Sequence, residues 1–69
     1  MEVEEEVPLD SVPAAVKDAI QKRAAKGQIV LVESVSKNGS IVAYEAKIKT
    51  AGKTSEIAVK PDGSPAKEP

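Results

Sequence analysis

Apolar and polar residues alternate on both sides of a short glycine-containing connection, and this alternation limits the fold more than any other feature. The stretch AYEAKIKTAGKTSEIAVKPDG covers residues 43–63 and is interrupted at Ala51-Gly52. Strict alternation is typical of a strand that buries one face, and glycine in a short loop favours a hairpin. We therefore predict two paired strands at about 41–49 and 54–60.

A pair of opposite charges supports one register for this hairpin. A loop of two or four residues pairs Ala46 with Ile57 on the inner face and sets Lys47 opposite Glu56 on the outer face. Opposite charges directly across a strand pair are favourable. We expect this register, with the core on the face that carries Ala46.

A second hairpin is predicted around Asn38-Gly39, which separates two apolar stretches. A loop with an even number of residues would pair Glu33 with Tyr44 on the core face and bury a carboxylate without a partner. A three-residue loop that ends at the glycine sends Glu33 to solvent and places Val30 and Val32 on the core face. We predict the three-residue loop.

The segment DSVPAAVKDAIQKRAAKG, residues 10–27, carries helix signals at both ends. Pro13 suits the first helical turn, and Asp10 or Ser11 can accept hydrogen bonds from free backbone N–H groups there. Gly27 can take the left-handed position that follows a helix. At about 100° per residue, the apolar side chains fall on one face: Val12, Ala15, Val16, Ala19 and Ile20. We predict a helix over about 13–26.

Arg23 falls within this apolar face, where a buried unpaired charge is unfavourable. The residue lies in the last turn, so its methylene groups can follow the core edge while the guanidinium reaches the last helical carbonyls. We expect this arrangement, and the alternative is a ligand-binding role for the side chain.

The two ends of the chain differ from its centre. Residues 1–8 carry repelling glutamates, and we expect a flexible acidic lead there. Because valines alternate with the glutamates, a short edge strand is the alternative. Near the other end a turn is expected at Pro61-Asp62-Gly63, and Pro65 is unfavourable in a central strand, so residues 64–69 are predicted to be a mobile tail.

The length of 69 residues allows one small domain. There is no cysteine, histidine or tryptophan, so neither a disulfide nor the usual zinc ligands can stabilise it. The predicted fold is α+β, with one N-terminal helix packed on an antiparallel β-meander of three strands, or four if the lead is a strand. The predicted elements are a helix at about 13–26 and strands at about 29–36, 41–49 and 54–60.

Composition also argues against several functions. Without His or Cys there is no recognisable nucleophile–base arrangement, and we expect no enzymatic activity and no catalytic residues. The acidic residues Glu4 to Glu6 lack the loop spacing and glycine of a calcium site, so we expect no metal and no cofactor. A net charge of −1 gives no long-range attraction for nucleic acid. No apolar run is long enough for membrane insertion, and no signal peptide is present in the sequence.

Apolar residues remain on the sheet face that the helix does not cover. In the predicted register this outer face carries four candidate partner-binding residues: Leu31, Val35, Ile41 and Ala43. An even loop would expose Val30 and Val32 together with Ile41 and Ala43. Exposed aliphatic residues are common on β-surfaces, and the N-terminal segment could cover them. The functional alternative is a contact surface, recognised by shape and apolar contact, for a partner or a second copy.

Three stretches, VPLDSVPAAVKDAI, GQIVLVES and AYEAKIKTAGKTSEIAVKPDG, resemble the helix, first strand and terminal hairpin of PepSY domains. The resemblance is strongest to small PepSY-like proteins related in fold to β-lactamase inhibitor protein repeats. It covers about residues 7–63 and lies in the order of many residues: Leu9, Val12-Pro13, Ala15, Val16, Ile20, Ile29, Val32, Tyr44-Glu45, Ile48 and Asp62-Gly63. Two departures are Ser55, where an aromatic residue is common, and Ser64-Pro65, which replaces the usual strand continuation. The resemblance implies a single PepSY-like domain over 9–63.

The resemblance to PepSY domains also implies an exported protein, periplasmic or extracellular, that binds and restrains peptidases without catalytic residues of its own. We therefore expect a non-enzymatic protein-binding module, peptidase-inhibiting or regulatory, that acts through the outer sheet face. The alternative is a structural or self-assembly domain that forms a homodimer through the same face.

Overall fold

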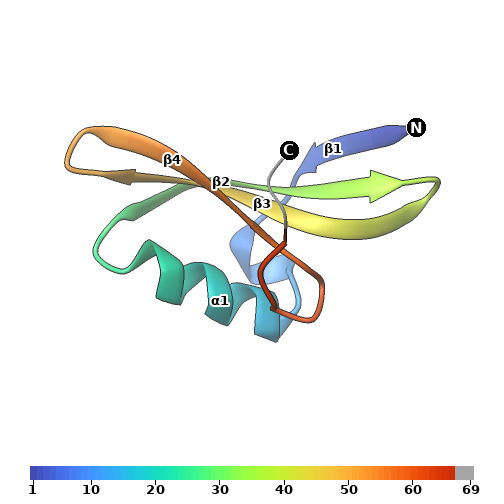
Figure 1. The fold of residues 1–69 in the computed structure, drawn as a ribbon, viewed down its shortest axis with the longest axis horizontal. Coiled ribbons are helices and arrows are strands. Elements are labelled where there is room, and N and C mark those ends of the chain that lie inside the picture. The colour runs from blue at the N-terminus through green and yellow to red at the C-terminus, as the bar shows by residue number, and fades with distance from the viewer. Residues whose placement is uncertain (67–69) are drawn as a thin grey trace.

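A computed structural model describes residues 1–66 and shows one helix packed on one face of a four-stranded antiparallel sheet (Figure 1). This is the predicted α+β fold. Along the chain the elements are β1 (Glu2–Glu6), the 3₁₀ turn η1 (Leu9–Ser11), α1 (Ala14–Ala24), β2 (Gln28–Lys37), β3 (Ser40–Thr50) and β4 (Lys53–Val59). The strands lie side by side in the order β1-β2-β3-β4. Within the described residues, no helix has the length and apolar character needed to cross a membrane.

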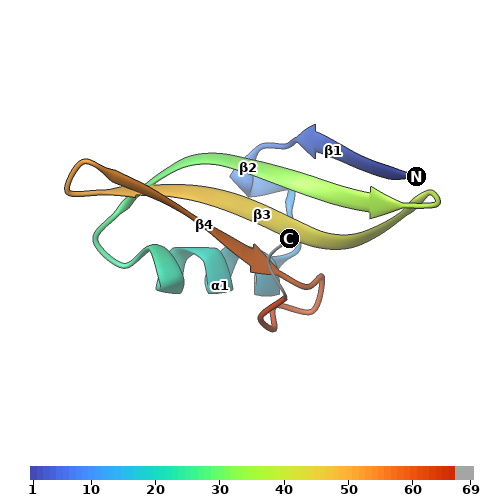
Figure 2. The same ribbon diagram turned by 45° about the horizontal axis from the view of Figure 1, so that its top comes forward.

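The acidic N-terminal segment forms the edge strand β1, the second of the two arrangements that the sequence left open. It pairs antiparallel with β2, from Glu2 opposite Lys37 to Glu6 opposite Glu33. β1 and the tip of the β2–β3 hairpin extend beyond the end of α1 in both views of the ribbon (Figure 2). Main-chain hydrogen bonds to β2 therefore hold β1 at a place where the helix does not support it.

The core lies between α1 and the inner face of the sheet. Val16 and Ile20 of α1 are fully buried and come from the face that the helical periodicity predicted. The sheet contributes a larger group of buried residues: Val32, Tyr44, Ala46, Ile48, Ile57 and Val59. Because the chain has no cysteine, apolar packing of these side chains is the main source of stability.

The hairpin β3–β4 has the predicted register. Ala46 lies opposite Ile57 on the inner face, and Lys47 lies opposite Glu56 on the outer face. The turn contains the two residues Ala51-Gly52, both with positive φ. The alternation in the sequence therefore identifies the two faces of this hairpin correctly.

The hairpin β2–β3 closes with a two-residue turn, so the predicted three-residue loop is wrong. Asn38 and Gly39 have φ angles of 52° and 83°, the left-handed pair found in tight hairpin turns. Lys37 and Ser40 lie opposite each other at the base of the turn. Glycine fits the second position because it has no Cβ to oppose a positive φ.

A β-bulge in β3 changes the side-chain alternation that this short turn sets. Val35 pairs with Ala43, whereas the next residue, Ser36, pairs with Ile41, so Val42 has no partner on β2. One extra residue on one strand of a pair shifts the alternation beyond it. The bulge therefore allows Glu33 of β2 to face outward even though the hairpin closes with a two-residue turn.

Glu33 lies on the outer face opposite Glu45, as predicted for this side chain, although the bulge rather than the loop places it there. A second irregularity lies between Ile29 and Leu31, and Val30 has no partner on β3. Val30 is 56% exposed, so its predicted place on the core face is wrong.

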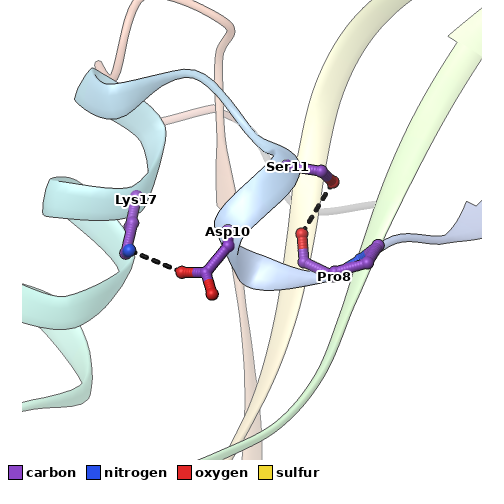
Figure 3. A network of polar contacts seen from close by, with 4 residues as sticks. All are labelled: Pro8, Asp10, Ser11 and Lys17. Atoms are coloured by element: carbon purple, nitrogen blue, oxygen red, sulfur yellow. Dashed lines mark hydrogen bonds and ion pairs between the residues drawn. The ribbon is translucent and has the colours of Figure 1, made fainter.

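Neither Asp10 nor Ser11 caps α1, contrary to the prediction. Lys17 Nζ donates to Asp10 Oδ1 at 2.6 Å, and Ser11 Oγ donates to the Pro8 carbonyl oxygen at 2.8 Å (Figure 3). The N-cap position is Pro13, without a side-chain cap. The hydrogen bond and charge of Lys17 lower the pKa of Asp10. The first contact attaches the η1 turn to α1, and the second closes the turn itself.

Arg23 is exposed, as expected, but its guanidinium does not bind the helical carbonyls. Its Nη1 donates to the carbonyl oxygen of Ala58 in β4 at 3.3 Å. The same oxygen accepts the Ala66 N–H at 3.0 Å. Arg23 therefore connects the last turn of α1 to the edge of the sheet.

The predicted turn after β4 is present, and the Gly63 N–H donates to the Lys60 carbonyl oxygen at 2.8 Å. The chain then returns along β4, where Pro65 lies opposite Val59 in an isolated bridge. The bridging hydrogen bonds come from the neighbours of Pro65, so its missing N–H costs nothing. Residues 64–66 of the predicted mobile tail are thus paired with β4, and residues 67–69 lie outside the described residues.

The end of α1 differs from the prediction that Gly27 takes the left-handed position. Ala25 is the residue with positive φ, at 52° with ψ of −113°, a region that glycine favours. Gly27 instead lies where a side chain has no room. A Cβ there would be 2.7 Å from Ile48 Cγ2 and would overlap the Thr50 hydroxyl.

We expect Ala25→Gly and Gly27→Ala to change stability in opposite directions. Ala25→Gly should raise the free energy of unfolding by up to about 1 kcal/mol, because it relieves the positive φ of an alanine. Gly27→Ala should lower it by about 2 kcal/mol, because Ile48 and Thr50 must move. Urea unfolding followed by circular dichroism measures both, and a stabilising Gly27→Ala would contradict the close approach.

Deletion of Val42 should leave the register of the β2–β3 hairpin intact, because this residue has no partner to lose. Deletion of Lys47, which has partners on both sides, should unfold the chain by reversing the faces of the residues beyond it. Nuclear Overhauser contacts between Val35 and Ala43 report on the register. Their loss in the Val42 deletion would show that the bulge itself holds the pairing.

Candidate functional site

The outer face of the sheet is acidic rather than apolar. Residues directly opposite each other on paired strands share a face, so the register assigns the outer positions. Six glutamates from all four strands occupy them: Glu2, Glu4, Glu6, Glu33, Glu45 and Glu56. We call this surface the acidic face.

The structure brings together two of the four predicted partner-binding residues, Val35 and Ala43, which lie directly opposite each other on the outer face. Leu31 is half-buried on the outer face opposite Lys47, and Ala43 is half-buried opposite Val35. Val35 itself is buried between Ala43 and the β1 glutamate that pairs with it. Ile41 is 46% exposed but pairs with a serine on the helix side of the sheet. The outer face therefore offers no broad apolar patch made of these four residues.

Three carboxylates meet at the centre of the acidic face. Glu33 of β2 lies directly opposite Glu45 of β3, and Glu4 comes from β1 on the far side of β2. One carboxylate oxygen from each of the three lies within 4.8 Å of the other two. Three adjacent strands thus position one carboxylate cluster, which we call the glutamate triad.

Glu45 is the most enclosed member of the triad, with only 8% of its surface exposed. Burial raises the pKa of Glu45 most, and the charges of Glu4, Glu56, Glu33 and Glu2 raise it further. The ion pairs of residues 1–66 join Lys17 to Asp10 and Lys22 to Asp18, and none reaches the triad. Within the described residues, no ion pair therefore offsets the like charges that act on Glu45.

Sequence reasoning placed Glu33 and Glu45 on the outer face but missed the triad. The missing residue was Glu4, because the N-terminal segment was expected to be flexible. The signal was present in MEVEEEV, where Glu2, Glu4 and Glu6 share one face of a potential strand. Without the pairing partner of that strand, however, its position beside Glu33 could not be derived.

The chemistry available to the acidic face is binding of positive charge. Carboxylates accept hydrogen bonds from lysine and arginine and provide oxygen ligands for hard metal ions. The acidic face can therefore accept a cationic group.

Comparison with known proteins finds no family model, no curated protein and no solved structure that matches this chain. The PepSY resemblance therefore stays a prediction that rests on the residues quoted for it, and the function is argued from the geometry of the acidic face.

The charge of Glu45 should make stability depend on pH. Its pKa is raised in the folded state, so the folded protein holds this proton more tightly than the unfolded chain does. The resulting stabilisation is complete below the ordinary pKa of about 4.5 and is lost as pH rises through the higher folded value. We expect Glu45→Gln to raise the free energy of unfolding at pH 7 by about 0.5–1 kcal/mol and to weaken this pH dependence.

Urea unfolding at pH 4 and pH 7 measures this effect. The matched control is Glu5→Gln, which removes the same charge from the same sheet but from the opposite face of β1. A control that stabilises the protein as much as Glu45→Gln would mean that overall charge, rather than the triad, causes the change.

Proposed function

We propose that the chain is a non-enzymatic protein-binding module that docks the cationic surface of a partner on its acidic face. The observation that carries this proposal is the glutamate triad, to which no ion pair of the described residues extends. Lysine or arginine side chains of a partner would relieve the repulsion that the folded domain otherwise retains.

The distribution of charge supports the same conclusion. The net charge of the chain is only −1, yet the outer face carries more negative than positive charge. Two of its six glutamates lie directly opposite lysines, Glu2 opposite Lys37 and Glu56 opposite Lys47, whereas the triad glutamates have no lysine directly opposite them. A local excess of negative charge steers and orients an approaching partner even when the net charge is small. Recognition is thus electrostatic, where the sequence alone suggested apolar contact.

The class of partner in this proposal comes from the PepSY resemblance, which suggests an exported domain that binds and restrains a peptidase. The acidic face adds a physical requirement to that idea. A matching peptidase would present lysine or arginine residues around the surface that the domain covers. This requirement can be tested on purified peptidases without knowledge of the natural partner.

The charges of the acidic face argue against the alternative of a homodimer through this surface. A two-fold axis would bring the triad of one copy against the same surface of its partner. Like charges placed together across an interface are unfavourable by several kcal/mol unless they are neutralised. We therefore expect the domain to be monomeric at neutral pH, which light scattering over a wide concentration range measures.

The proposed function is tested with two variants of equal charge. Glu4→Gln, Glu33→Gln and Glu45→Gln together remove the triad, and Glu5→Gln, Asp18→Asn and Asp62→Asn together remove three charges elsewhere. Inhibition of peptidases with basic surfaces is measured by substrate cleavage, and their binding by calorimetry at low and high salt.

We expect the wild type and the control variant to bind and inhibit a basic peptidase, with affinity falling as salt rises. The triad variant should bind at least tenfold more weakly. Equal weakening of both variants would leave only a net-charge effect. Absence of binding by the wild type to every basic peptidase tested would overturn the peptidase proposal.

A further inference from the structure

We infer that the free edge of β1 binds an extended basic segment of a partner as an added antiparallel strand. Lysine or arginine residues of that segment would alternate with other residues, so that they lie opposite Glu2, Glu4 and Glu6. The inference rests on the proposed function, because the same acidic face attracts the partner, and it adds how the partner's main chain is held. In strand addition, main-chain hydrogen bonds give affinity and alternate side chains give specificity.

The hydrogen bonds of β1 show which of its main-chain groups are free. The Val7 N–H donates to the Val32 carbonyl oxygen at 2.9 Å, and the Asn38 N–H donates to the Met1 carbonyl oxygen at 3.3 Å. Both bonds continue the register of β1 with β2. Main-chain groups of an antiparallel strand point alternately to its two sides, so the odd-numbered residues of β1 bond to β2. The even-numbered residues direct their N–H and C=O groups to the free edge: Glu2, Glu4 and Glu6.

β1 is the outer strand of the sheet, and no main chain within residues 1–66 pairs with its free edge. The edge formed by β4 differs, because the Ala58 carbonyl oxygen accepts the Ala66 N–H and Arg23 Nη1. The chain therefore covers part of one sheet edge and leaves β1 open (Figure 2). An open edge presents N–H and C=O groups that can pair with another chain.

The side chains at the edge select the chemistry of the added strand. Residues directly opposite each other share a face, so a residue added opposite Glu4 would lie on the acidic face beside that carboxylate. On the β2 side, Glu2 already lies opposite Lys37. Glu4 and Glu6 have no lysine opposite them there, so an added strand can supply the opposite charge.

The inner face of the same edge favours an apolar residue. Val3 lies opposite Ser36, which lies opposite Ile41, so these three residues form a row on the inner face. Val3 is 49% exposed and Ile41 is 46% exposed, since β1 and the hairpin tip extend beyond α1 (Figure 1). An apolar side chain opposite Val3 would extend this row and bury part of it.

A second copy of the chain is a poor occupant of this edge. Antiparallel pairing of β1 with another β1 through the free groups would bring even-numbered residues together, and all three are glutamates. Like charges directly opposite each other are unfavourable. The glutamates therefore protect the edge from self-association while they favour a basic strand.

The test uses a seven-residue peptide, blocked at both ends, with lysine at the second, fourth and sixth positions, valine at the fifth and threonine elsewhere. Antiparallel pairing places its lysines opposite Glu6, Glu4 and Glu2 and its valine opposite Val3. One derivative is N-methylated at the three lysine amides, which removes the N–H groups that would donate to β1. The matched derivative is N-methylated at the third, fifth and seventh amides, which would point away from β1.

Calorimetry and amide signals of the ¹⁵N-labelled protein measure binding. We expect the unmodified peptide to bind and to slow the solvent exchange of the Glu4 amide. Methylation of the lysine amides should weaken binding at least tenfold, and methylation of the other amides should have little effect. Absence of peptide binding, equal effects of the two derivatives or the opposite order would overturn antiparallel strand addition.

Two variants of the chain give an independent readout. Glu4→Pro removes an N–H at the free edge, where proline is tolerated because no bond to β2 is lost. Glu4→Gln removes the same charge but keeps the N–H. Once circular dichroism shows both to be folded, Glu4→Pro should bind the peptide several-fold more weakly than Glu4→Gln, and equal binding would overturn the inference. If Glu4→Pro does not fold, the two methylated peptides decide with the wild type.

These experiments separate the inference from the proposed function. Peptidase binding that depends on the triad, together with peptide binding that is insensitive to methylation, would retain the acidic face as a docking surface and reject strand addition. Sensitivity to methylation of the lysine amides without binding of any basic peptidase would retain strand addition and reject the peptidase proposal.

Discussion

The pairing of β2 with β3 decides which side chains face the core and which face outward. Val42 lets β2 and β3 close through a tight two-residue turn while Glu33 and Glu45 still face each other outside the core. Without the bulge, the same turn would direct Glu33 against Tyr44 in the core. The apolar core and the acidic face therefore both follow from a pairing that skips Val42 and keeps Glu33 opposite Glu45.

Repulsion among the glutamates of the acidic face lowers the free energy of unfolding, and the rest of the fold must offset this loss. Paired glutamates on adjacent strands are unfavourable, and the core that opposes them has one aromatic ring and no disulfide. Proteins of this size have little stability to spare, so this repulsion is a substantial cost. Binding of a partner's positive charge would return part of the free energy that the repulsion removes.

The sequence by itself determined the α+β fold, the apolar face of α1 and the full register of β3–β4, because each follows from local periodicity and a short turn. It also placed Glu33 and Glu45 outside, since burying a carboxylate is costly. Only the tertiary structure decided that a bulge, rather than a longer loop, places Glu33 outside. One extra residue in the loop and one extra residue in the strand change which face a side chain occupies in the same way, so the sequence does not distinguish them. The tertiary structure alone also placed Glu4 beside Glu33 and Glu45, because pairing of β1 with β2 joins segments about thirty residues apart and leaves no local pattern in the chain.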